Sequence, residues 1–476
     1  MVRGVRLRDQ LAKSASPTLA EPVPRLEKAS LAYAMNRTAT LTSSISGLPD
    51  WFVALFCTVM PLNSFVLIPS VQGTVPAYML AFVSACFVIM SRDGGESNVQ
   101  RARYFRIALG VAGIWLLLFC GSQLGHVFSN RRDFGEMNLI NPDDPTVLFR
   151  STIFTQSLYL AACVCIALFF RFFFREEWMR YVLWGGWFLA LYGIYEWLFF
   201  LIFQHPGDFI VNRSYGNGAH TASWSQVVQI GSFSLLRIKS TFGEPSFFSA
   251  GVIPYFFLAQ QYKRKWLSLA LLFCLVFSTS SSAYVAFPVA LALQSLFQRK
   301  LSRATLITIV LFLAAFATLY YVFPETYNQM FTEKMNGENN SGQTRQDSWD
   351  TMQETLRTFT FMNRLFGIGF GYFYGGVYYA ILVNTGWIGM LVYFYAFLKP
   401  VILLRSDQGA LALKVGLAAL FFLFYISVSE LFLPSTWMFL GLAYWRLDQQ
   451  KAQRRGIRTG NLESPAHGYA LPAGNS

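Results

Sequence analysis

Charged side chains are scarce in this chain of 476 residues, where they make up 13% of the sequence. A soluble globular domain carries about twice that share. Hydrophobic residues reach 54%, and Phe alone occurs 47 times. The charges are also unevenly spread, because long apolar stretches alternate with short charged ones, as in segments that dissolve in lipid. The composition excludes an ordinary soluble globule and predicts an all-α polytopic membrane protein.

Histidine and cysteine are rare too, with four and six residues. All cysteines lie inside apolar stretches, and no histidine stands near a cysteine, an aspartate or another histidine at a metal-site spacing. We therefore expect no metal and no cofactor, and interpret the cysteines as buried apolar thiols. No cleavable signal peptide is visible, since the first 45 residues are polar and basic.

Twelve apolar segments follow one another along the chain and predict about twelve transmembrane helices. The 33-residue stretch around Ser280-Ser281-Ser282 is too long for one crossing, so we divide it into two spans at these serines. The chain then reads as a basic tail (1–47), a single transmembrane domain (48–447) and a second tail (448–476). The predicted spans are 48–69, 73–90, 104–125, 151–174, 178–203, 246–262, 266–281, 283–298, 304–323, 377–398, 411–430 and 434–447.

The positive charges orient these spans. Of the 38 Lys and Arg residues, 28 fall in the two tails and in alternate connections between spans. The positive-inside rule therefore predicts that both termini are cytoplasmic. The net charge of +13 is explained by this topology and does not indicate a nucleic-acid partner.

Three connections then lie outside the cytoplasm, at residues 126–150, 204–245 and 324–376. The last two have about 40 and 50 residues, and connections of such length are usually functional. We expect them to carry short amphipathic helices and the active site of any enzyme.

The first candidate site runs from Arg237 to Ser246. Pro245 suits the first position of a helix and Glu244 the cap, so a span begins here with its amino end facing outward. Such an end attracts anions, and Arg237 and Lys239 add two charges, an arrangement that suits a pyrophosphate. Glu244 could also act as a base towards a sugar hydroxyl. The alternative is that Glu244 only caps the helix while the basic residues bind lipid headgroups.

The second candidate is Arg345, at the start of a segment whose apolar residues recur at helical spacing. Trp349, Met352, Leu356, Phe359 and Leu365 form this pattern, which predicts an amphipathic helix along the outer interface. Arg345 could reach a phosphate or a sugar there. A solvated charge at a helix end is the alternative.

Other residues invite simpler interpretations. The run from Gly367 to Gly371 follows a helix and not a strand, so we expect close backbone packing and not a phosphate loop. Ser280-Ser281-Ser282 should satisfy free backbone groups at the tip of the hairpin. His126, His205 and His220 are expected in outer loops, and His220 is the best catalytic candidate of the three because Arg213 stands in the same loop. Glu196 and Glu430 lie in or at the ends of spans, where charge is costly and often functional, although snorkelling would also explain them.

The ordered set of these motifs resembles the superfamily of Wzy-type O-antigen polymerases and O-antigen ligases. The resemblance rests on the segment from Ser240 to Ser246, the hairpin with its serine-rich tip, Arg345 with Trp349, the glycine run 367–371 and the run Asn384-Thr385-Gly386-Trp387-Ile388-Gly389. It is best over residues 237–393.

This resemblance implies a metal-independent glycosyltransferase of the GT-C-like class in the bacterial cytoplasmic membrane. Its donor would be an undecaprenyl-diphosphate-linked oligosaccharide, used on the outer face, and its other partners would be membrane lipids, a chain-length regulator and a flippase. The implied catalytic residues are Glu244, Arg237 and Arg345. The implied substrate-binding residues are Arg213, Lys239, Ser246 and His220.

One departure bears on the reaction. Many relatives, ligases above all, place a histidine just before the span that begins here at Val377, and this chain has none there. The absence favours a repeat-unit polymerase for a surface polysaccharide over an O-antigen ligase. A transporter or flippase is a third reading, but no internal repeat with polar residues at mid-membrane is visible. A non-catalytic scaffold of an envelope complex is a fourth.

Overall fold

The computed structural model describes residues 48–68, 71–91, 96–129, 148–210, 226–230, 233–338, 340–407 and 409–462. Residues 43–451 form one compact unit, and the two chain ends, 1–42 and 452–476, are assigned to a second. Of the second unit only 452–462 is described, as the continuation of a helix that starts in the first.

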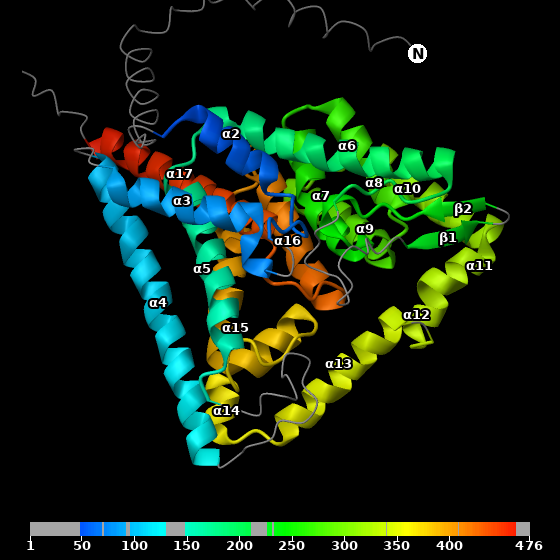
Figure 1. The fold of residues 1–476 in the computed structure, drawn as a ribbon. Coiled ribbons are helices and arrows are strands. Elements are labelled where there is room, and N and C mark those ends of the chain that lie inside the picture. Colours follow the sequence, from blue (N-terminus) through cyan, green and yellow to red (C-terminus); the bar gives the residue numbers. More distant parts are fainter. Residues whose placement is uncertain are drawn as a thin grey trace, which may run out of the picture. The chain divides into compact units, whose positions relative to one another are not determined.

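Each of the twelve predicted apolar segments contains one helix (Figure 1). Pro254, Pro288 and Pro400 lie inside three of these helices without ending them. The helices are α2 (Asp50–Val59), α3 (Pro76–Met90), α4 (Glu96–Ser129), α5 (Ser151–Phe172), α6 (Met179–Phe203), α7 (Pro245–Gln261), α8 (Lys265–Phe277), α9 (Ser281–Gln298), α10 (Arg303–Val322), α15 (Val377–Leu403), α16 (Leu411–Ile426) and α17 (Pro434–Leu462).

Five described stretches are long and apolar enough to cross a membrane: Asn98–Phe128, Ser151–Phe172, Glu176–Phe203, Thr305–Val322 and Val377–Leu403. Other apolar helices are shorter. For example, α8 has 13 residues and measures about 20 Å, against a hydrocarbon core of about 30 Å. The structure therefore agrees with a helical, multi-pass membrane protein, while the count of twelve crossings stays a prediction.

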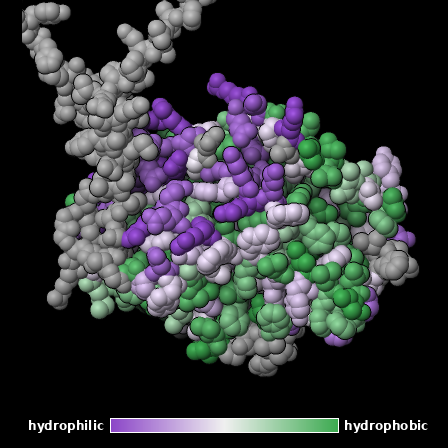
Figure 2. Space-filling view, turned by 90° about the horizontal axis from the view of Figure 1, so that it is seen from above, coloured by the Kyte–Doolittle hydropathy of each residue, from purple (hydrophilic) through white to green (hydrophobic). Residues whose placement is uncertain are grey.

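The surface agrees with this class. Figure 2 shows hydrophilic residues gathered in the upper part of the viewed face, whereas hydrophobic residues cover much of the lower part. Leu116 and Leu117 on α4 and Val310 and Leu311 on α10 are all more than half exposed. Large apolar side chains are stable in such positions when they face lipid and not water.

Helix α7 lies at the centre of the unit, with nearly every side chain buried against α6, α8, α9 and α16. Two glycines make the close packing possible. A Cβ at Gly251 would come within 2.0 Å of the Phe242 ring, and one at Gly416 would come within 3.1 Å of Pro254. The 3-10 turn η3 (Ser240–Phe242) is thereby seated directly on α7, just before the predicted site.

The described part of the loop 204–245 differs from the expected amphipathic helix. It contains an antiparallel hairpin of β1 (Val227–Ile230) and β2 (Phe233–Leu236), in which Val227 pairs with Leu236. The residues of both strands are mostly β-branched or aromatic, or long and aliphatic, and such residues fit a half-buried pleated strand better than a short helix. The all-α prediction is therefore wrong for this segment.

The loop 324–376 is helical, as expected. It begins with α11 (Pro324–Tyr327), a π-helical turn η4 (Asn328–Thr332) and α12 (Glu333–Met335), and continues with α13 (Asn340–Arg357) and α14 (Phe361–Phe366). In Figure 1 it runs from the side of the β-hairpin to the side of α4 and α15. The predicted amphipathic pattern from Trp349 to Leu365 is divided, because α13 ends at Arg357 and Leu365 lies in α14. In α13 the apolar residues Met352 and Leu356 pack with Ile153 and Val383. The apolar side of α13 thus covers other parts of the protein.

Helix α15 is broken at Gly386, where φ is 64° and ψ is −166°. The glycine run packs into this break, since a Cβ at Gly367 would come within 2.3 Å of the Asn384 carbonyl carbon and oxygen. Asn384 secures the contact, because its side chain donates to the Phe373 carbonyl and accepts from the Phe373 N–H, each at 2.8 Å. The prediction of close backbone packing for residues 367–371 is confirmed.

Candidate active site

Arg237 follows directly after β2 and is held by the turn between α8 and α9. Its Nε donates to Thr279 Oγ1 and its Nη2 to the Thr279 carbonyl, each at 3.1 Å. The third nitrogen, Nη1, donates to the side chain of Gln226. Burial lowers the pKa of Arg237 to about 10, while Glu244 opposes this shift. The guanidinium therefore keeps its charge at neutral pH.

The turn that holds Arg237 has an unusual backbone. Thr279 has a φ of 43°, in the left-handed region that a β-branched residue rarely adopts. Such a conformation costs on the order of 1–3 kcal/mol and persists only where the surroundings fix it. Here the Thr279 hydroxyl and carbonyl both accept from Arg237, and the N–H donates to the Val276 carbonyl at 3.2 Å. The strained residue is thus part of the anchor of the arginine.

Glu244 occupies the N-cap position of α7, and the helix begins at Pro245 as predicted. Its side chain makes no capping hydrogen bond, so it is not committed to the end of the helix. Its Oε2 accepts from the Ser246 hydroxyl at 3.2 Å. Burial raises the pKa of the Glu244 carboxyl, against the opposing effects of the Ser246 hydroxyl and of Lys334, Arg237 and Arg345. A carboxylate with a raised pKa is a better base than an exposed one.

Lys334 reaches the same place from the other long loop. It lies in α12, and its Nζ donates to Ser281 Oγ at 2.9 Å, at the start of α9. Burial lowers the pKa of this amine to about 7, helped by repulsion from Arg345 and Arg237 and opposed by Glu244. The serine-rich tip of the α8–α9 hairpin therefore contacts two cations, Arg237 through Thr279 and Lys334 through Ser281.

Arg345 completes the group from the first half of α13. Burial lowers its pKa, and the nearby charge of Glu244 opposes the shift. Arg237, Lys334 and Arg345 all act electrostatically on Glu244, so the four side chains share one partly buried region. We call these four residues the Glu244 cluster. They come from the end of the β-hairpin, the start of α7, α12 and α13, four elements that are separate in the sequence.

The structure thus brings together the three residues predicted as catalytic, Glu244, Arg237 and Arg345. Lys334 was missed, although it is one of the few cations in the predicted outer segments. Its approach to the cluster depends on the π-helical turn η4 just before it, which has no clear signature in the sequence. Such turns occur often at functional sites.

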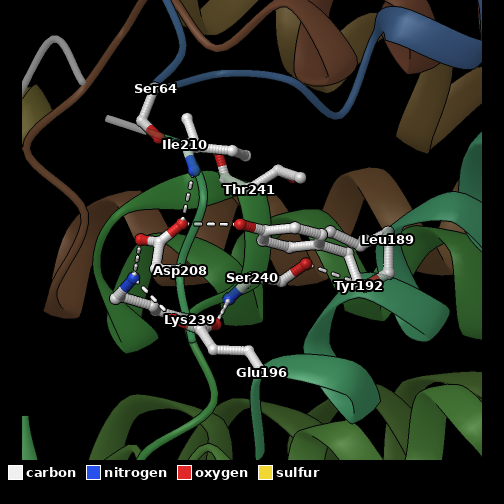
Figure 3. Close-up of polar contacts among 9 residues, drawn as sticks. All are labelled: Ser64, Leu189, Tyr192, Glu196, Asp208, Ile210, Lys239, Ser240 and Thr241. Atoms are coloured by element: carbon white, nitrogen blue, oxygen red, sulfur yellow. Dashed lines mark hydrogen bonds and ion pairs between the residues drawn. The ribbon is translucent and has the colours of Figure 1, made fainter. Parts of the chain in front are cut away.

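Lys239 lies elsewhere, in a fully buried ion triad (Figure 3). Its Nζ is 2.6 Å from Glu196 Oε1 and 2.6 Å from Asp208 Oδ2. Asp208 also accepts from the Tyr192 hydroxyl at 2.5 Å, and Glu196 Oε2 accepts from the Ser240 N–H at 3.2 Å. All three charged side chains are 0–1% exposed, so Lys239 has no surface left for a substrate.

The triad assigns Lys239 and Glu196 a structural role. It links α6, the residues after it and the turn η3, and therefore fixes the backbone that leads to Glu244. We accordingly do not keep Lys239 among the substrate-binding residues. Snorkelling, the alternative offered for Glu196, is wrong, because its carboxylate is buried and paired with a lysine.

The remaining predicted residues divide into two groups. Ser246 lies beside Glu244, to which it donates, and is half-buried. Arg213 and His220 are outside the described residues, so their predicted roles stay predictions. His126 was expected in a loop but lies in the last turn of helix α4, where it is buried and its ring contacts the Ile368 carbonyl and the Tyr372 ring.

This geometry is suited to a multiply charged anion. Three basic side chains act on a single carboxylate, so positive charge exceeds negative charge in a region partly shielded from water. Interactions between charges are stronger there than at an open surface. Two of the cations are oriented by hydrogen bonds to one turn, so they are in place before a ligand arrives.

Comparison with known proteins finds a family match over one part of this chain. Residues 266–381 match the model of the family described as O-antigen ligase, Wzy_C. No curated protein and no solved structure matches the chain. The matched segment includes Lys334, Arg345 and the glycine run, while Arg237 and Glu244 precede it. The resemblance to the Wzy and O-antigen ligase superfamily is confirmed through this segment.

Proposed function

We propose that this chain, whose residues 266–381 match the model of the O-antigen ligase family, is a polymerase of lipid-linked oligosaccharide repeat units. It acts on the outer face of the bacterial cytoplasmic membrane, with both termini inside. The donor is an oligosaccharide on undecaprenyl diphosphate. The acceptor is a sugar hydroxyl of a second lipid-linked unit, and repeated transfers build a surface polysaccharide.

The observation that carries this proposal is the Glu244 cluster. Its three cations match the charge of a lipid diphosphate, whose negative charge grows as it leaves the sugar. In the reaction the bond between the anomeric carbon and the diphosphate oxygen breaks, and a bond from that carbon to the acceptor oxygen forms. Glu244 takes the proton of the acceptor hydroxyl. Arg237, Lys334 and Arg345 hold the departing diphosphate.

Arg345 and Arg357 provide a matched test of this role, because both lie in α13. Arg357 is exposed, whereas Arg345 is half-buried in the cluster. Arg345→Ala should lower kcat by about 10²–10³, the usual effect of removing one group that stabilises transition-state charge. Arg357→Ala should leave it within a factor of two or so. Equal rates for both variants, measured on purified protein with a lipid-linked oligosaccharide, would remove Arg345 from the site.

A ligase is the second candidate, favoured by the description of the matched family. The polymerase hypothesis rests on the absence of a histidine just before Val377. Purified protein should be given the donor with either a second lipid-linked repeat unit or a lipid A core acceptor. Extension of the repeat unit into a ladder supports the polymerase. A single transfer to the lipid A core, without a ladder, supports the ligase.

A further inference from the structure

A cavity of about 260 Å³ lies close to the Glu244 cluster. Tyr374 lines its wall and lies near enough to both Glu430 and Glu244 for their charges to act on it. Asn63 also lines the wall. Its neighbour Ser64 donates to the Thr241 carbonyl at 2.8 Å, and this hydrogen bond joins the wall to the segment that leads to Glu244. Thr241 is three residues before Glu244. The cavity therefore lies near the proposed reaction centre.

The polar side chains in this wall carry carboxylate, amide and hydroxyl groups, all of which form hydrogen bonds with the hydroxyl groups of a ligand. Glu430, in the connection between α16 and α17, supplies a carboxylate, while Asn63 and Gln156 supply amides. Asn63 is 4% exposed, and its Oδ1 has no hydrogen-bond partner among the described residues. A buried polar atom of this kind requires a partner, and a bound hydroxyl would provide one. Tyr374 adds a further hydroxyl, which shares a hydrogen bond of 3.0 Å with Ser429.

Aromatic rings form much of the rest of the wall. Tyr78 and Tyr159 are stacked with 5.6 Å between ring centroids, and Phe432 meets the ring of Tyr159 edge-on at 6.0 Å and that of Phe370 at 5.8 Å. A pyranose ring has hydroxyl groups on its rim and C–H groups on its faces. A wall of aromatic rings with a few polar groups suits both parts of such a molecule.

A second cavity, of about 180 Å³, adjoins the first and is almost wholly apolar. The two share four wall residues: Phe370, Ile381, Asn384 and Leu431. The second cavity lies among α4, α5 and α15, three helices that are long and apolar enough to cross a membrane. Its lining, which includes Trp115 and Leu118, suits a hydrocarbon chain and offers almost nothing to a sugar.

We propose that the two cavities together bind one lipid-linked saccharide, the acceptor of the transfer reaction, with its sugar in the first cavity and the start of its chain in the second. The inference deepens the proposed function and rests on it. Glu430, Asn63 and Tyr374 contact the sugar hydroxyls. The head of the acceptor then faces Glu244, which can take the proton of the attacking hydroxyl, while the donor diphosphate occupies the three cations.

Photocrosslinking in living cells tests this proposal for a saccharide of any identity. The full-length protein carries p-benzoylphenylalanine at Leu118, inside the apolar cavity, or at Leu117, its exposed neighbour on α4 that does not line the cavity. Adducts are identified by mass spectrometry. We expect a lipid with a saccharide head at Leu118 and ordinary phospholipids at Leu117. The adduct mass distinguishes a polyprenyl-diphosphate saccharide from an acylated one.

Variants of the polar wall complete the test. Glu430→Gln should lower the yield of the saccharide adduct at Leu118 at least fivefold, at equal protein level in the membrane, whereas Glu354→Gln, an exposed change in α13, should leave it unchanged. Phospholipid adducts alone at both positions, or an undiminished yield in Glu430→Gln, would overturn the proposal. Glu244→Gln should keep the adduct while it loses transfer, so failure of the proposed chemistry and failure of this binding site give different results.

Discussion

Lys334 gives the site a pH dependence that can be measured on the purified protein. Burial and the repulsion of Arg345 and Arg237 hold the pKa of its amine at about 7. Below that pH the side chain carries a charge that helps to hold the diphosphate, and above it the charge is lost. Because kcat/KM reports the free enzyme, it should fall as the pH rises through about 7. On the acid side it should rise as Glu244 loses its proton.

The size of the alkaline fall follows from the same value. At pH 8.5 about 3% of the free protein would carry the charge on Lys334, so kcat/KM should drop by up to roughly 30-fold from its maximum. At high pH kcat/KM should level off at the value of a site in which Lys334 is neutral. Lys334→Gln should already be at that level near neutral pH, and Lys334→Arg should show no alkaline fall, since an arginine stays charged over this range.

The assay is the initial rate of glycan transfer from a lipid-linked oligosaccharide in detergent micelles, from pH 5.5 to 9 at constant ionic strength. Arg357→Gln, an exposed change in the neighbouring helix α13, serves as the control and should keep the wild-type profile. An alkaline fall that persists in Lys334→Arg would refute the reasoning. A wild-type rate that increases through pH 7 and is lost in Lys334→Gln would instead make the neutral amine the base.

Two further predictions concern stability. Lys239→Met leaves Glu196 and Asp208 buried without their counter-charge and should lower the free energy of unfolding by about 3–5 kcal/mol. The triple variant that also carries Glu196→Gln and Asp208→Asn should recover much of that loss. Unfolding by SDS in mixed micelles measures both, and equal stability of Lys239→Met and wild type would contradict the triad. Gly386→Ala places a Cβ within 2.4 Å of the Leu365 carbonyl at a φ of 64°, so it should lower the free energy of unfolding by at least about 1–3 kcal/mol. Size-exclusion chromatography after heating measures the thermal transition. An unchanged transition would show that α15 is not broken there.

The sequence predicted those parts of the site that depend on local signals. Pro245 after a polar cap position marked the start of α7, and the helical spacing of Met352 and Leu356 marked α13. The grouping of Glu244 with Arg345 was inferred from the topology and from the resemblance to a family. The inference from topology needs only the order and direction of the spans, which apolar runs and positive charges determine.

The remaining features depend on tertiary contacts. Lys239 looks like a second phosphate ligand beside Arg237, but Asp208, 31 positions away, and Glu196 on α6 take up its charge. Their partnership follows from how α6 packs against η3, which no local pattern encodes. The position of Lys334 likewise depends on the π-helical turn and on the hairpin tip that it contacts.

Replacement of Glu244 tests the central claim most directly. Purified full-length protein is incubated with an undecaprenyl-diphosphate-linked oligosaccharide, and the products are separated by length on a gel, for wild type, Glu244→Gln and the exposed control Glu354→Gln. The account predicts a ladder for wild type and for Glu354→Gln, and no extension for Glu244→Gln at equal protein concentration. A ladder from Glu244→Gln at the wild-type rate would contradict it.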